Sequence, residues 1–551
     1  MTTSPRFHGW SSLVLLALAG LLAAVFAGRQ HALTVRPRPP EDRNVLRVAF
    51  TPALVPDPHR RVFPLSQYNL LILSLWEPLV ECDPATSRPQ PAAAQSWSWS
   101  SDGLTLTLKL RPDARWSNGD LVTAHDFVRG WHRLFAQNKT LAWTLAPLKN
   151  AEAYLRGQVK DIQAVGAHAL DDLTLRLDLD KPRSTLVVEL ADPLLSPLHR
   201  TADETLATKS YYGKASTLVT NGPFHLVQAN PDGFRLAASK YYHDRAGVRL
   251  GGVQFIRAAN PSIASLLVAA GVVDLLAPTP YGPLRDKPTE RPVSLESELV
   301  LGVSVLDINT SRGPLRDVRV RQALALALDR MGPIRKFNPG RMEPAWSWVP
   351  TMPGREGLVL LKEDAAEARR LLAAAGYPGG KGFPVLRLSL PQWLEDDPYP
   401  LAWSERWFQE LGVRTYLAYE SRANWDARMQ GGDYDLMYGT LLATVPDAGD
   451  LLGGFTQSVE FSLNKWTDPA VVALLNDAHT LSGPERLAAL EKAERAIMAA
   501  VPSVPVMFER RQIMRANEVR GWYVDSLARQ NLKRLWLDLP SMRDPDAVYD
   551  Q

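Results

Sequence analysis

Apolar and polar residues alternate between Leu104 and Leu110, where every second residue is leucine and the residues between them are threonine or lysine. A hydrophobic period of two predicts a strand with one buried face. Residues 117–120, Ser-Asn-Gly-Asp, follow this strand. They predict a tight turn, because Asn and Gly tolerate positive φ angles and Ser and Asp bond to the nearby backbone.

A helix is predicted directly after this turn. Thr123 and Asp126 have the spacing of a capping box, in which the first residue caps the helix and the third helical residue bonds back to it. The apolar residues that then share one helical face are Phe127, Val128, Trp131, Leu134 and Phe135. The pattern from Leu104 to Phe135 therefore predicts a strand, a turn and a helix, and it indicates no chemistry of its own.

The C-terminal half alternates between strand and helix patterns. The expected elements are helices from Asp317 and at 363–375, a strand at 385–390, a helix at 401–411, a strand at 413–419, a short helix at 424–429 and a strand at 434–438. Strand, helix, strand, helix, strand is typical of a parallel α/β sheet. Because ligands of such sheets lie beyond the carboxyl ends of strands, we expect residues 438–450 at the mouth of a cleft.

The N-terminal half mixes shorter elements. Residues 44–50 predict a strand, and the segment 75–198 is rich in strand patterns such as residues 173–179. At 551 residues the chain exceeds what one hydrophobic core usually supports, so two or three lobes are expected.

Composition excludes several classes of protein. The 62 basic and 59 acidic residues leave a net charge of only +3, which indicates no nucleic-acid surface. Cys82 is the only cysteine, so an intrachain disulfide and a multi-cysteine metal site are both excluded.

The N-terminus predicts export. Arg6 precedes an apolar run from Leu13 to Ala27, and residues 25–27 suit cleavage by signal peptidase. Residues 1–28 are therefore expected to be a signal peptide or an uncleaved membrane anchor, since the run lies near the lower length limit for a membrane span. Residues 29–44 form a proline-rich linker.

Sequence motifs of common enzymes are missing. The chain contains no His-Glu-x-x-His, no Gly-x-Ser-x-Gly and no Gly-x-x-x-x-Gly-Lys motif, so we expect no enzyme activity, no cofactor and no metal. His125 and His132 are expected on the solvated face of the capped helix, and Trp143 and Leu145 in the core.

Several segments resemble the peptide/nickel class of solute-binding proteins that serve ABC importers. Residues 116–128, WSNGDLVTAHDFV, are similar to the signature of that class. Further similar segments, in the same order, are 57–59 (DPH), 74–97 (SLWEPLVECDPATSRPQPAAAQSW), 219–224 (VTNGPF), 271–274 (GVVD), 317–324 (DVRVRQAL) with 329–330 (DR), and, in general character, 496–508. The resemblance spans roughly residues 45–540.

The resemblance implies the fold. The expected fold class is α/β, namely the two-lobe periplasmic-binding-protein fold of class II type, cluster C, with an extra α/β domain. Its implied parts are lobe I (45–74, 199–298 and 515–545), the extra domain (75–198) and lobe II (299–514).

The resemblance also implies a function. The chain is expected to be a monomeric receptor in the periplasm or on the outer face of the cell membrane. It would capture an oligopeptide or related small solute between its lobes and deliver it to the permease subunits of an ABC importer, without binding nucleic acid. The alternative is a membrane-anchored sensor or peptide chaperone on the same fold, with no role in transport.

In peptide-binding relatives, an aspartate binds the free amino group of the ligand, and Thr444 stands at the matching position here. A hydroxyl cannot replace the carboxylate charge, whose loss costs roughly 2–5 kcal/mol. Asp447 or Asp450 could compensate, or could merely cap a loop. The ligand-binding residues implied by the matching segments are Val62, Phe63, Asn221, Trp346, Tyr438, Thr440, Leu441, Leu442, Thr444 and Asp447, with Trp348 a weaker candidate. Each aromatic residue among them could equally serve packing.

Overall fold

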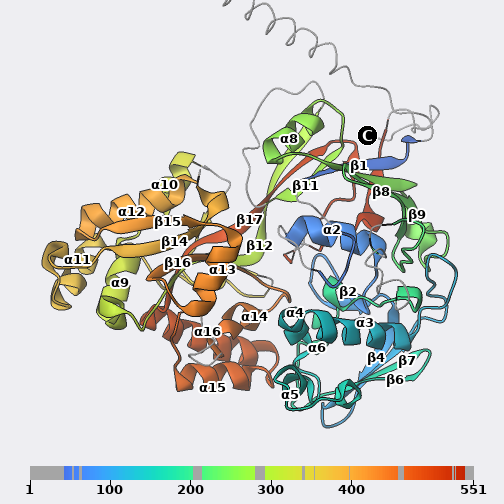
Figure 1. Cartoon of the computed structure of the whole chain (residues 1–551), viewed down its shortest axis with the longest axis horizontal. Coiled ribbons are helices and arrows are strands. Elements are labelled where there is room, and N and C mark those ends of the chain that lie inside the picture. Colours follow the sequence, from blue (N-terminus) through green and yellow to red (C-terminus); the bar gives the residue numbers. More distant parts are fainter. Residues whose placement is uncertain are drawn as a thin grey trace, which may run out of the picture.

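The computed structural model describes residues 42–539 except 52–54, 61–64, 203–211, 213, 280–291, 338–341, 353, 396, 457–463, 524–525 and 528. Two halves of the molecule share one eleven-stranded sheet (Figure 1). Its strands are β1 (Val45–Phe50), β8 (Phe224–Asn230), β9 (Gly233–Ala238), β10 (Gly252–Arg257), β11 (Leu275–Thr279), β12 (Val293–Ile308), β13 (Glu343–Pro344), β14 (Leu386–Pro391), β15 (Thr415–Glu420), β16 (Leu436–Leu442) and β17 (Ser503–Ala516). The order is β15-β14-β16-β12-β17-β11-β1-β10-β9-β8, and β13 pairs with β17.

Lobe I contains β1 and β8 to β11 together with helices α2 (Leu65–Leu75) and α8 (Pro261–Ala269). Strand β1 lies between β11 and β10 and is parallel to both. Asp274, in the segment before β11, is fully buried and forms a two-point ion pair with Arg47 of β1, with Nη2 2.9 Å from Oδ1. This ion pair connects β1 to the start of its neighbour β11.

Lobe II contains β13 to β16 and most of the later helices. These are α9 (Val318–Ala327), α10 (Met331–Phe337), α11 (Ala365–Ala374), α12 (Pro398–Leu411), α13 (Arg422–Gly431), α14 (Ala448–Leu452), α15 (Pro469–Ala478) and α16 (Gly483–Ala500). The predicted parallel arrangement is confirmed, because β14 is parallel to both β15 and β16. Strand β16 starts two residues later than predicted and continues to Leu442, where antiparallel pairing with β12 extends it.

The extra domain is built on a separate antiparallel sheet of order β4-β5-β7-β6. Its strands are β4 (Ala94–Trp99), β5 (Thr105–Leu110), β6 (Ala167–Asp171) and β7 (Thr174–Asp178), and its helices are α3 (Ala124–Gln137), α4 (Lys139–Ala142), α5 (Ala151–Leu155) and α6 (Leu186–Glu189). Two two-stranded sheets lie outside these: β2 (Val80–Cys82) with β3 (Pro89–Pro91), and β18 (Val519–Arg520) with β19 (Trp536–Leu537).

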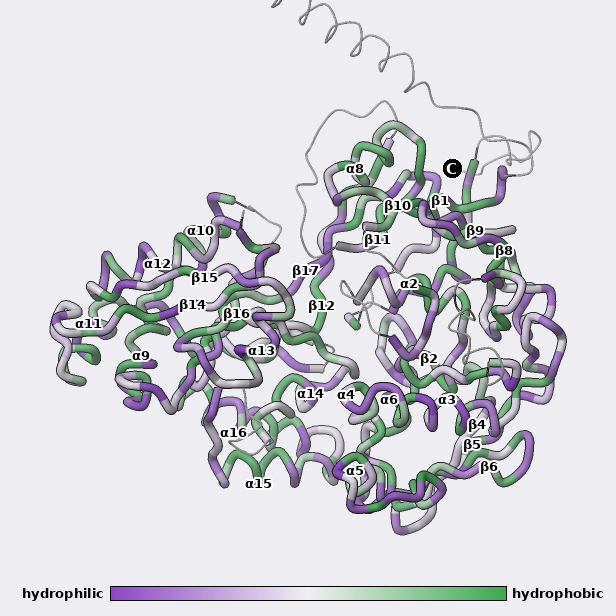
Figure 2. Tube along the Cα trace, in the orientation of Figure 1, coloured by the Kyte–Doolittle hydropathy of each residue, from purple (hydrophilic) through white to green (hydrophobic). Residues whose placement is uncertain are grey.

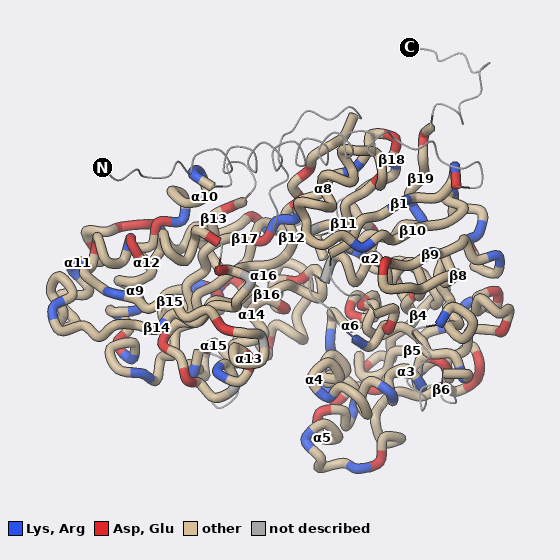
Figure 3. Tube along the Cα trace, turned by 45° about the horizontal axis from the view of Figure 1, so that its top comes forward, with Lys and Arg blue, Asp and Glu red and all other residues tan. Residues whose placement is uncertain are grey.

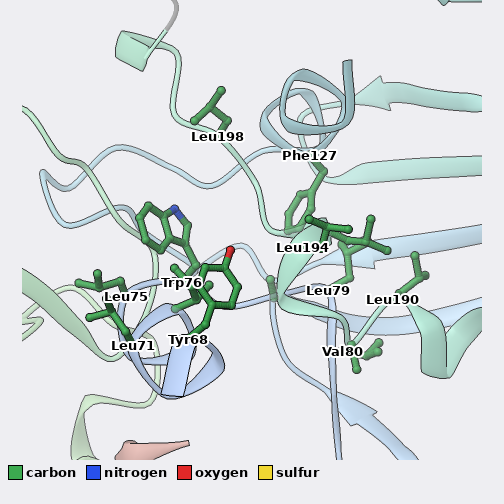
Figure 4. Packing of buried hydrophobic residues seen from close by; sticks show 14 of the residues in the cluster. Tyr68, Leu71, Leu75, Trp76, Leu79, Val80, Phe127, Leu190, Leu194 and Leu198 are labelled. Carbon is green, nitrogen blue, oxygen red and sulfur yellow. The ribbon is translucent and has the colours of Figure 1, made fainter. Parts of the chain in front are cut away.

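Lobe I and the extra domain share one hydrophobic core. Leu71 and Leu75 of α2 belong to the same buried cluster as Phe127 of α3 and Leu190 and Leu194, which follow in the extra domain (Figure 4). Lobe II has a separate core. A third, small cluster of lobe I lies around Ala49, Val268 and Leu276. The two large cores show that the molecule divides mainly between lobe II and the rest. Burying such side chains removes roughly 25 cal/mol of unfavourable hydration per Å².

The hydropathy pattern follows this division. Helix α2 carries mainly hydrophobic positions, whereas the central strand β17 and outer helices such as α9 mix hydrophobic and hydrophilic ones (Figure 2). Charged residues of both signs are scattered over both halves (Figure 3), which agrees with the small net charge. In the described ranges, no helix has the length and apolar character needed to cross a membrane.

The capped helix predicted from Thr123 is present as α3. Asp126 accepts a hydrogen bond from the Thr123 main-chain N–H (2.9 Å), as the capping box requires, and a second one from the Thr123 hydroxyl (3.0 Å). Its carboxylate also accepts a hydrogen bond from the indole N–H of buried Trp116, at 3.0 Å. The signature segment thus folds around one buried carboxylate.

Three of the similar segments meet at a joint between lobe I and the extra domain. The side chain of Asn221 accepts from the Glu77 main-chain N–H (3.1 Å) and donates to the Glu77 carbonyl (2.9 Å). A Cβ on Gly222 would lie 2.5–2.7 Å from the backbone of Leu75, so only glycine fits this close approach. The Ser117 N–H donates to the carbonyl of Thr220 at 2.7 Å.

The segment Asp57-Pro58-His59 serves a second joint. The Asp57 carboxylate forms a two-point ion pair with Arg133 of α3, with both N–O distances 2.8 Å. His59 lies beside it, 2.7 Å from Arg133, and its burial, together with that guanidinium, lowers its pKa to about 4. The segment fixes the extra domain to the first loop of lobe I.

Candidate ligand-binding cleft

A cavity of about 740 Å³ lies between the extra domain and lobe II. Ligand sites for small molecules typically have volumes of roughly 300–1,000 Å³. The residues that line it are Trp143, Thr144, Ala146, Pro147, Glu152, Asp180, Lys181, Pro182, Arg183, Glu189 and Asp192 on the extra-domain side, and Thr444, Val445, Asp450, Thr456, Asn476, Asp477, His479 and Thr480 on the lobe II side. In Figure 1 these walls are the region of α4 to α6 and the region of α14 and α15.

The extra-domain wall begins with Trp143, in a short turn after α4. The prediction that Trp143 lies in the core is wrong, since 42% of the residue is exposed; Leu145, only 3% exposed, is in the core as expected. The turn points the indole outward because the neighbouring leucine occupies the buried position. The guanidinium of Arg156 lies 5.4 Å from the centre of the Trp143 ring and pairs with Glu152 at 2.8 Å.

The lobe II wall follows the carboxyl end of β16, as the α/β pattern predicted. The Ala443 N–H donates to the Leu301 carbonyl of β12 at 2.7 Å, which fixes the start of this loop. Asp450 of α14 folds back, and its Oδ2 accepts from the Thr444 main-chain N–H (2.5 Å), the Thr444 hydroxyl (3.1 Å) and the Val445 N–H (3.3 Å). A carboxylate therefore lies directly beside Thr444 in the cavity wall.

Asp447 points elsewhere. One of its oxygens accepts from the Gly449 N–H at 2.7 Å and caps α14. Both oxygens are bound by Arg486 of α16, at 2.6 and 2.9 Å. Because this carboxylate is occupied and does not line the cavity, the structure does not bring Asp447 to the cleft.

The two walls also touch directly. The main-chain N–H of Ser184 donates to the carbonyl of His479 at 3.3 Å, and Arg183 lies 3.5 Å from Nδ1 of the same histidine. Burial, together with the nearby cations Arg183 and Arg486, lowers the pKa of His479 to about 4. His479 is therefore neutral at pH 7 and makes the contact as an uncharged ring.

A second contact between the walls is made by Arg529, in the segment that follows β17. Its guanidinium donates to the carbonyl of Thr444 and lies 3.9 Å from the Asp192 carboxylate. Both charged side chains are 7% exposed. Arg529 thus joins the extra domain to the ligand-facing loop of lobe II.

The predicted residues of β16 lie in the strand that leads to the cavity. The hydroxyl of Thr440 is 3.0 Å from that of Ser304, and Leu441 and Leu442 are half-buried opposite β12. Tyr438 instead belongs to the lobe II core, where it is 4% exposed and its ring stacks on Trp403 at 6.1 Å. Of the predicted residues that the structure describes, Thr444 alone lines the cavity.

The other predicted residues are distributed over the molecule. Asn221 is 4% exposed and is occupied by the main chain of Glu77, so its role in this structure is to hold a joint. Trp346 is half-buried beside the Arg330 guanidinium, 5.5 Å from its ring, and Trp348 is buried in the lobe II core. Val62 and Phe63 lie outside the described residues.

Sequence reasoning missed most of the cavity wall, including Trp143, Asp180, Asp477 and His479. These residues stand in turns and at helix ends, where no period marks them. The proline that follows Lys181 is a local signal, and it indicates a turn. Among the residues that the structure describes, no three His, Cys, Asp or Glu side chains are grouped to hold a metal ion.

Comparison with known proteins agrees with this architecture. The family model described as bacterial extracellular solute-binding proteins, family 5 Middle, matches residues 88–462. The periplasmic murein peptide-binding protein MppA of Escherichia coli is 27% identical over 422 residues, which are 74% of this chain and 77% of that protein. The probable deoxycholate-binding periplasmic protein YgiS of Escherichia coli is 28% identical over 459 residues, 80% of this chain and 83% of that protein.

A solved structure gives the same result. The unliganded open form of the periplasmic murein tripeptide-binding protein MppA has a TM-score of 0.71 and 25% identity, and the match covers 90% of this chain and 98% of that one. The predicted fold class, two α/β lobes with an extra domain, is therefore confirmed. With the family model matching most of its length, the chain belongs to the bacterial extracellular solute-binding proteins of family 5.

Proposed function

We propose that this protein is an extracytoplasmic receptor that captures an oligopeptide or related small solute in the cleft and delivers it to the permease of an ABC importer. The observation that carries this proposal is a ligand-sized cavity between lobe II and the extra domain on the scaffold of this family. Relatives are named as periplasmic binding proteins for a murein peptide and for deoxycholate. The scaffold therefore supports capture of a solute, and the cavity wall must decide which one.

Closure of the two lobes is supported by their connection. Strands β12 and β17 cross between them, and their pairing shifts register between Leu299 and Val303. A register shift marks a β-bulge, where a strand pair bends and twists most easily. Bending there would move lobe II against the extra domain, and a permease would sense that change.

The free amino group of a peptide ligand is best matched by Asp450. One oxygen of its carboxylate accepts three hydrogen bonds from the Thr444 loop. Its other oxygen has no hydrogen bond to a described residue, so it is open to an ammonium group in the cavity. A buried ammonium needs such a counter-charge. Asp447 cannot supply it while Arg486 occupies both of its oxygens.

We propose the same domain boundaries as the sequence predicts, with lobe II at residues 299–514. The separate hydrophobic core of lobe II supports this boundary. Whether residues 1–28 are cleaved or retained as an anchor is decided by mass determination of the mature N-terminus. No observation favours the alternative of an anchored sensor or chaperone.

Thermal-shift screening tests the proposed function. The purified protein without its first 41 residues is exposed to short peptides with free amino termini, to the same peptides acetylated, and to deoxycholate. Peptide binding raises Tm by mass action, to a degree that depends on ligand concentration relative to Kd. If deoxycholate stabilises the protein and no peptide does, the receptor function stands but its peptide form is wrong. Stabilisation by neither class contradicts the proposal.

A further inference from the structure

Among the residues that line the cleft, carboxylates without an ion-pair partner outnumber cationic side chains without one. We propose that it selects solutes that carry a positively charged side chain, which Asp180 and Asp477 hold from opposite walls beside Trp143. This inference rests on the proposed function, because it assigns a ligand class to that same cleft. It concerns the side chain of the ligand and not its amino end.

Six carboxylates line the cavity, against Lys181 and Arg183. Two of them are neutralised at short distance: Glu152 pairs with Arg156 at 2.8 Å, and Glu189 pairs with Arg183 at 2.6 Å. A third, Asp192, has Arg529 at 3.9 Å.

The remaining three, Asp180, Asp450 and Asp477, form no ion pair within the described ranges. Lys181 is the one cation of the lining without such a pair there, and His479 is neutral at pH 7. The open charge of the cavity is therefore negative. Because Asp450 is assigned to the amino end of the ligand, Asp180 and Asp477 remain for a side chain.

Asp180 and Asp477 approach the cavity from different parts of the chain. Asp180 follows β7 of the extra domain, and its Oδ2 accepts one hydrogen bond from the Asn150 N–H at 3.2 Å. Asp477 stands in the last turn of α15 in lobe II, and its carboxylate has no hydrogen bond to any described residue. Both residues are exposed, so neither is needed for packing. A cation between them would attract both walls and favour closure.

Trp143 supplies a surface suited to the same group. An indole face attracts a cation within about 6 Å of the ring centre. The Arg156 guanidinium at 5.4 Å shows that this ring already accepts one. Apart from Trp143, the wall offers only small or aliphatic apolar residues such as Ala146, Pro147 and Val445. A polar, negatively charged cleft of this kind gives a large apolar side chain little to bind.

Calorimetric titration of three matched tripeptides tests the inference. Ala-Lys-Ala, Ala-norleucine-Ala and Ala-Glu-Ala share their free termini and differ in the charge of one side chain. We expect Ala-Lys-Ala to bind about tenfold tighter than the norleucine peptide, and the glutamate peptide to bind weakest, as two partly solvated charge pairs, with Asp180 and Asp477, imply. Raising the salt from about 20 mM to about 500 mM should shrink the ratio, because the Debye length falls to roughly 4 Å.

Variants locate the effect. Asp180→Asn together with Asp477→Asn should bring the affinities of the lysine and norleucine peptides within about threefold of each other. Asparagine keeps the hydrogen bond to Asn150, so Tm should not change. Asp113→Asn, an exposed extra-domain acid outside the cavity, removes the same type of charge and should leave the ratio as it is.

The outcomes separate this inference from the proposed function. Equal affinity for all three peptides, or a lysine preference that survives in the double variant, overturns the inference while the receptor stands. If none of the three peptides binds, the peptide form of the proposed function and the inference fail together.

Discussion

At the residue scale, Asp307 near the end of β12 is a carboxyl group of lobe II that lies in a poor environment for a charge. The residue is only 6% exposed, and burial raises its pKa to about 6, although the Ser503 hydroxyl donates a hydrogen bond to it. The charged form is thus disfavoured in the folded protein. Since one pKa unit corresponds to about 1.4 kcal/mol, ionising this group costs the fold up to about 3 kcal/mol.

Asp307→Asn should therefore stabilise the protein at neutral pH. With a folded pKa above the unfolded value, the contribution of Asp307 is fully present below about pH 4 and is lost as pH rises through about 6. Tm measured from pH 4 to 8 should coincide for variant and wild type near pH 4, separate as the pH rises to about 6, and differ by a constant amount above pH 6. A Tm difference that is the same over the whole range, or a similar gain from Asp113→Asn, would contradict this account.

Asp450 and Asp447 lie three residues apart and have different roles: Asp450 is proposed to bind the amino group of the ligand, and Asp447 caps α14 and binds Arg486. We expect Asp450→Asn to weaken binding of peptides with a free amino group by roughly 30-fold or more, from the loss of one member of a charge pair, and to leave acetylated peptides nearly unaffected. Titration calorimetry with the matched peptide pair measures both.

Asp447→Asn is the comparison for that variant. It breaks the two-point pair with Arg486 and weakens the cap of α14, so the free energy of unfolding should fall by about 3 kcal/mol. Affinity for the free peptide should stay within about threefold of wild type. If Asp447→Asn alone lost affinity, Asp450 would not be the amino-binding group.

At the scale of elements, the similar segments act as joints. The segment of Asn221 closes onto that of Glu77, the turn at Ser117 bonds to Thr220, and Asp57 binds Arg133 of α3. In each contact, a residue of a short polar motif bonds to the main chain or to a charged side chain of another segment. The motifs therefore report which scaffold the chain builds and not which solute it binds.

Asn221→Ala tests this interpretation. The change leaves the buried N–H and carbonyl of Glu77 without partners, at roughly 1–3 kcal/mol for each. Tm should fall clearly, while the affinity of the folded protein for a bound peptide, measured well below Tm, should stay the same. A large loss of affinity at unchanged Tm would instead restore Asn221 as a ligand contact.

At the scale of the whole molecule, the cleft is crossed by few contacts. Arg529 touches Thr444 and Asp192, and Ser184 touches His479. These contacts hold lobe II near the extra domain, and β12 and β17 connect the two halves through the large sheet. The balance between open and closed forms is set by such weak contacts and by the ligand.

Arg529→Ala should shift this balance toward the open form. Small-angle scattering should give a larger radius of gyration for the ligand-free variant than for the wild type, and saturating peptide should remove most of the difference. Arg529→Lys keeps the charge beside Asp192 and serves as control. An unchanged radius of gyration in Arg529→Ala would show that Arg529 does not hold the walls together.

The sequence by itself determined the local elements and the family scaffold. The strand before Ser117, the capping box of Thr123 and Asp126, and the helix capped by Asp317 all formed where predicted, because each depends on hydrogen bonds and periods within about ten residues. The tertiary structure alone decided the cleft. Its walls join residues 143–192 to residues 444–480, which no local pattern relates. Only the path of β12 and β17 between the cores brings the wall of Trp143 and Asp180 opposite the wall of Asp477. Within lobe II, the loop after β16 places Asp450 beside Thr444, which lacks a charge.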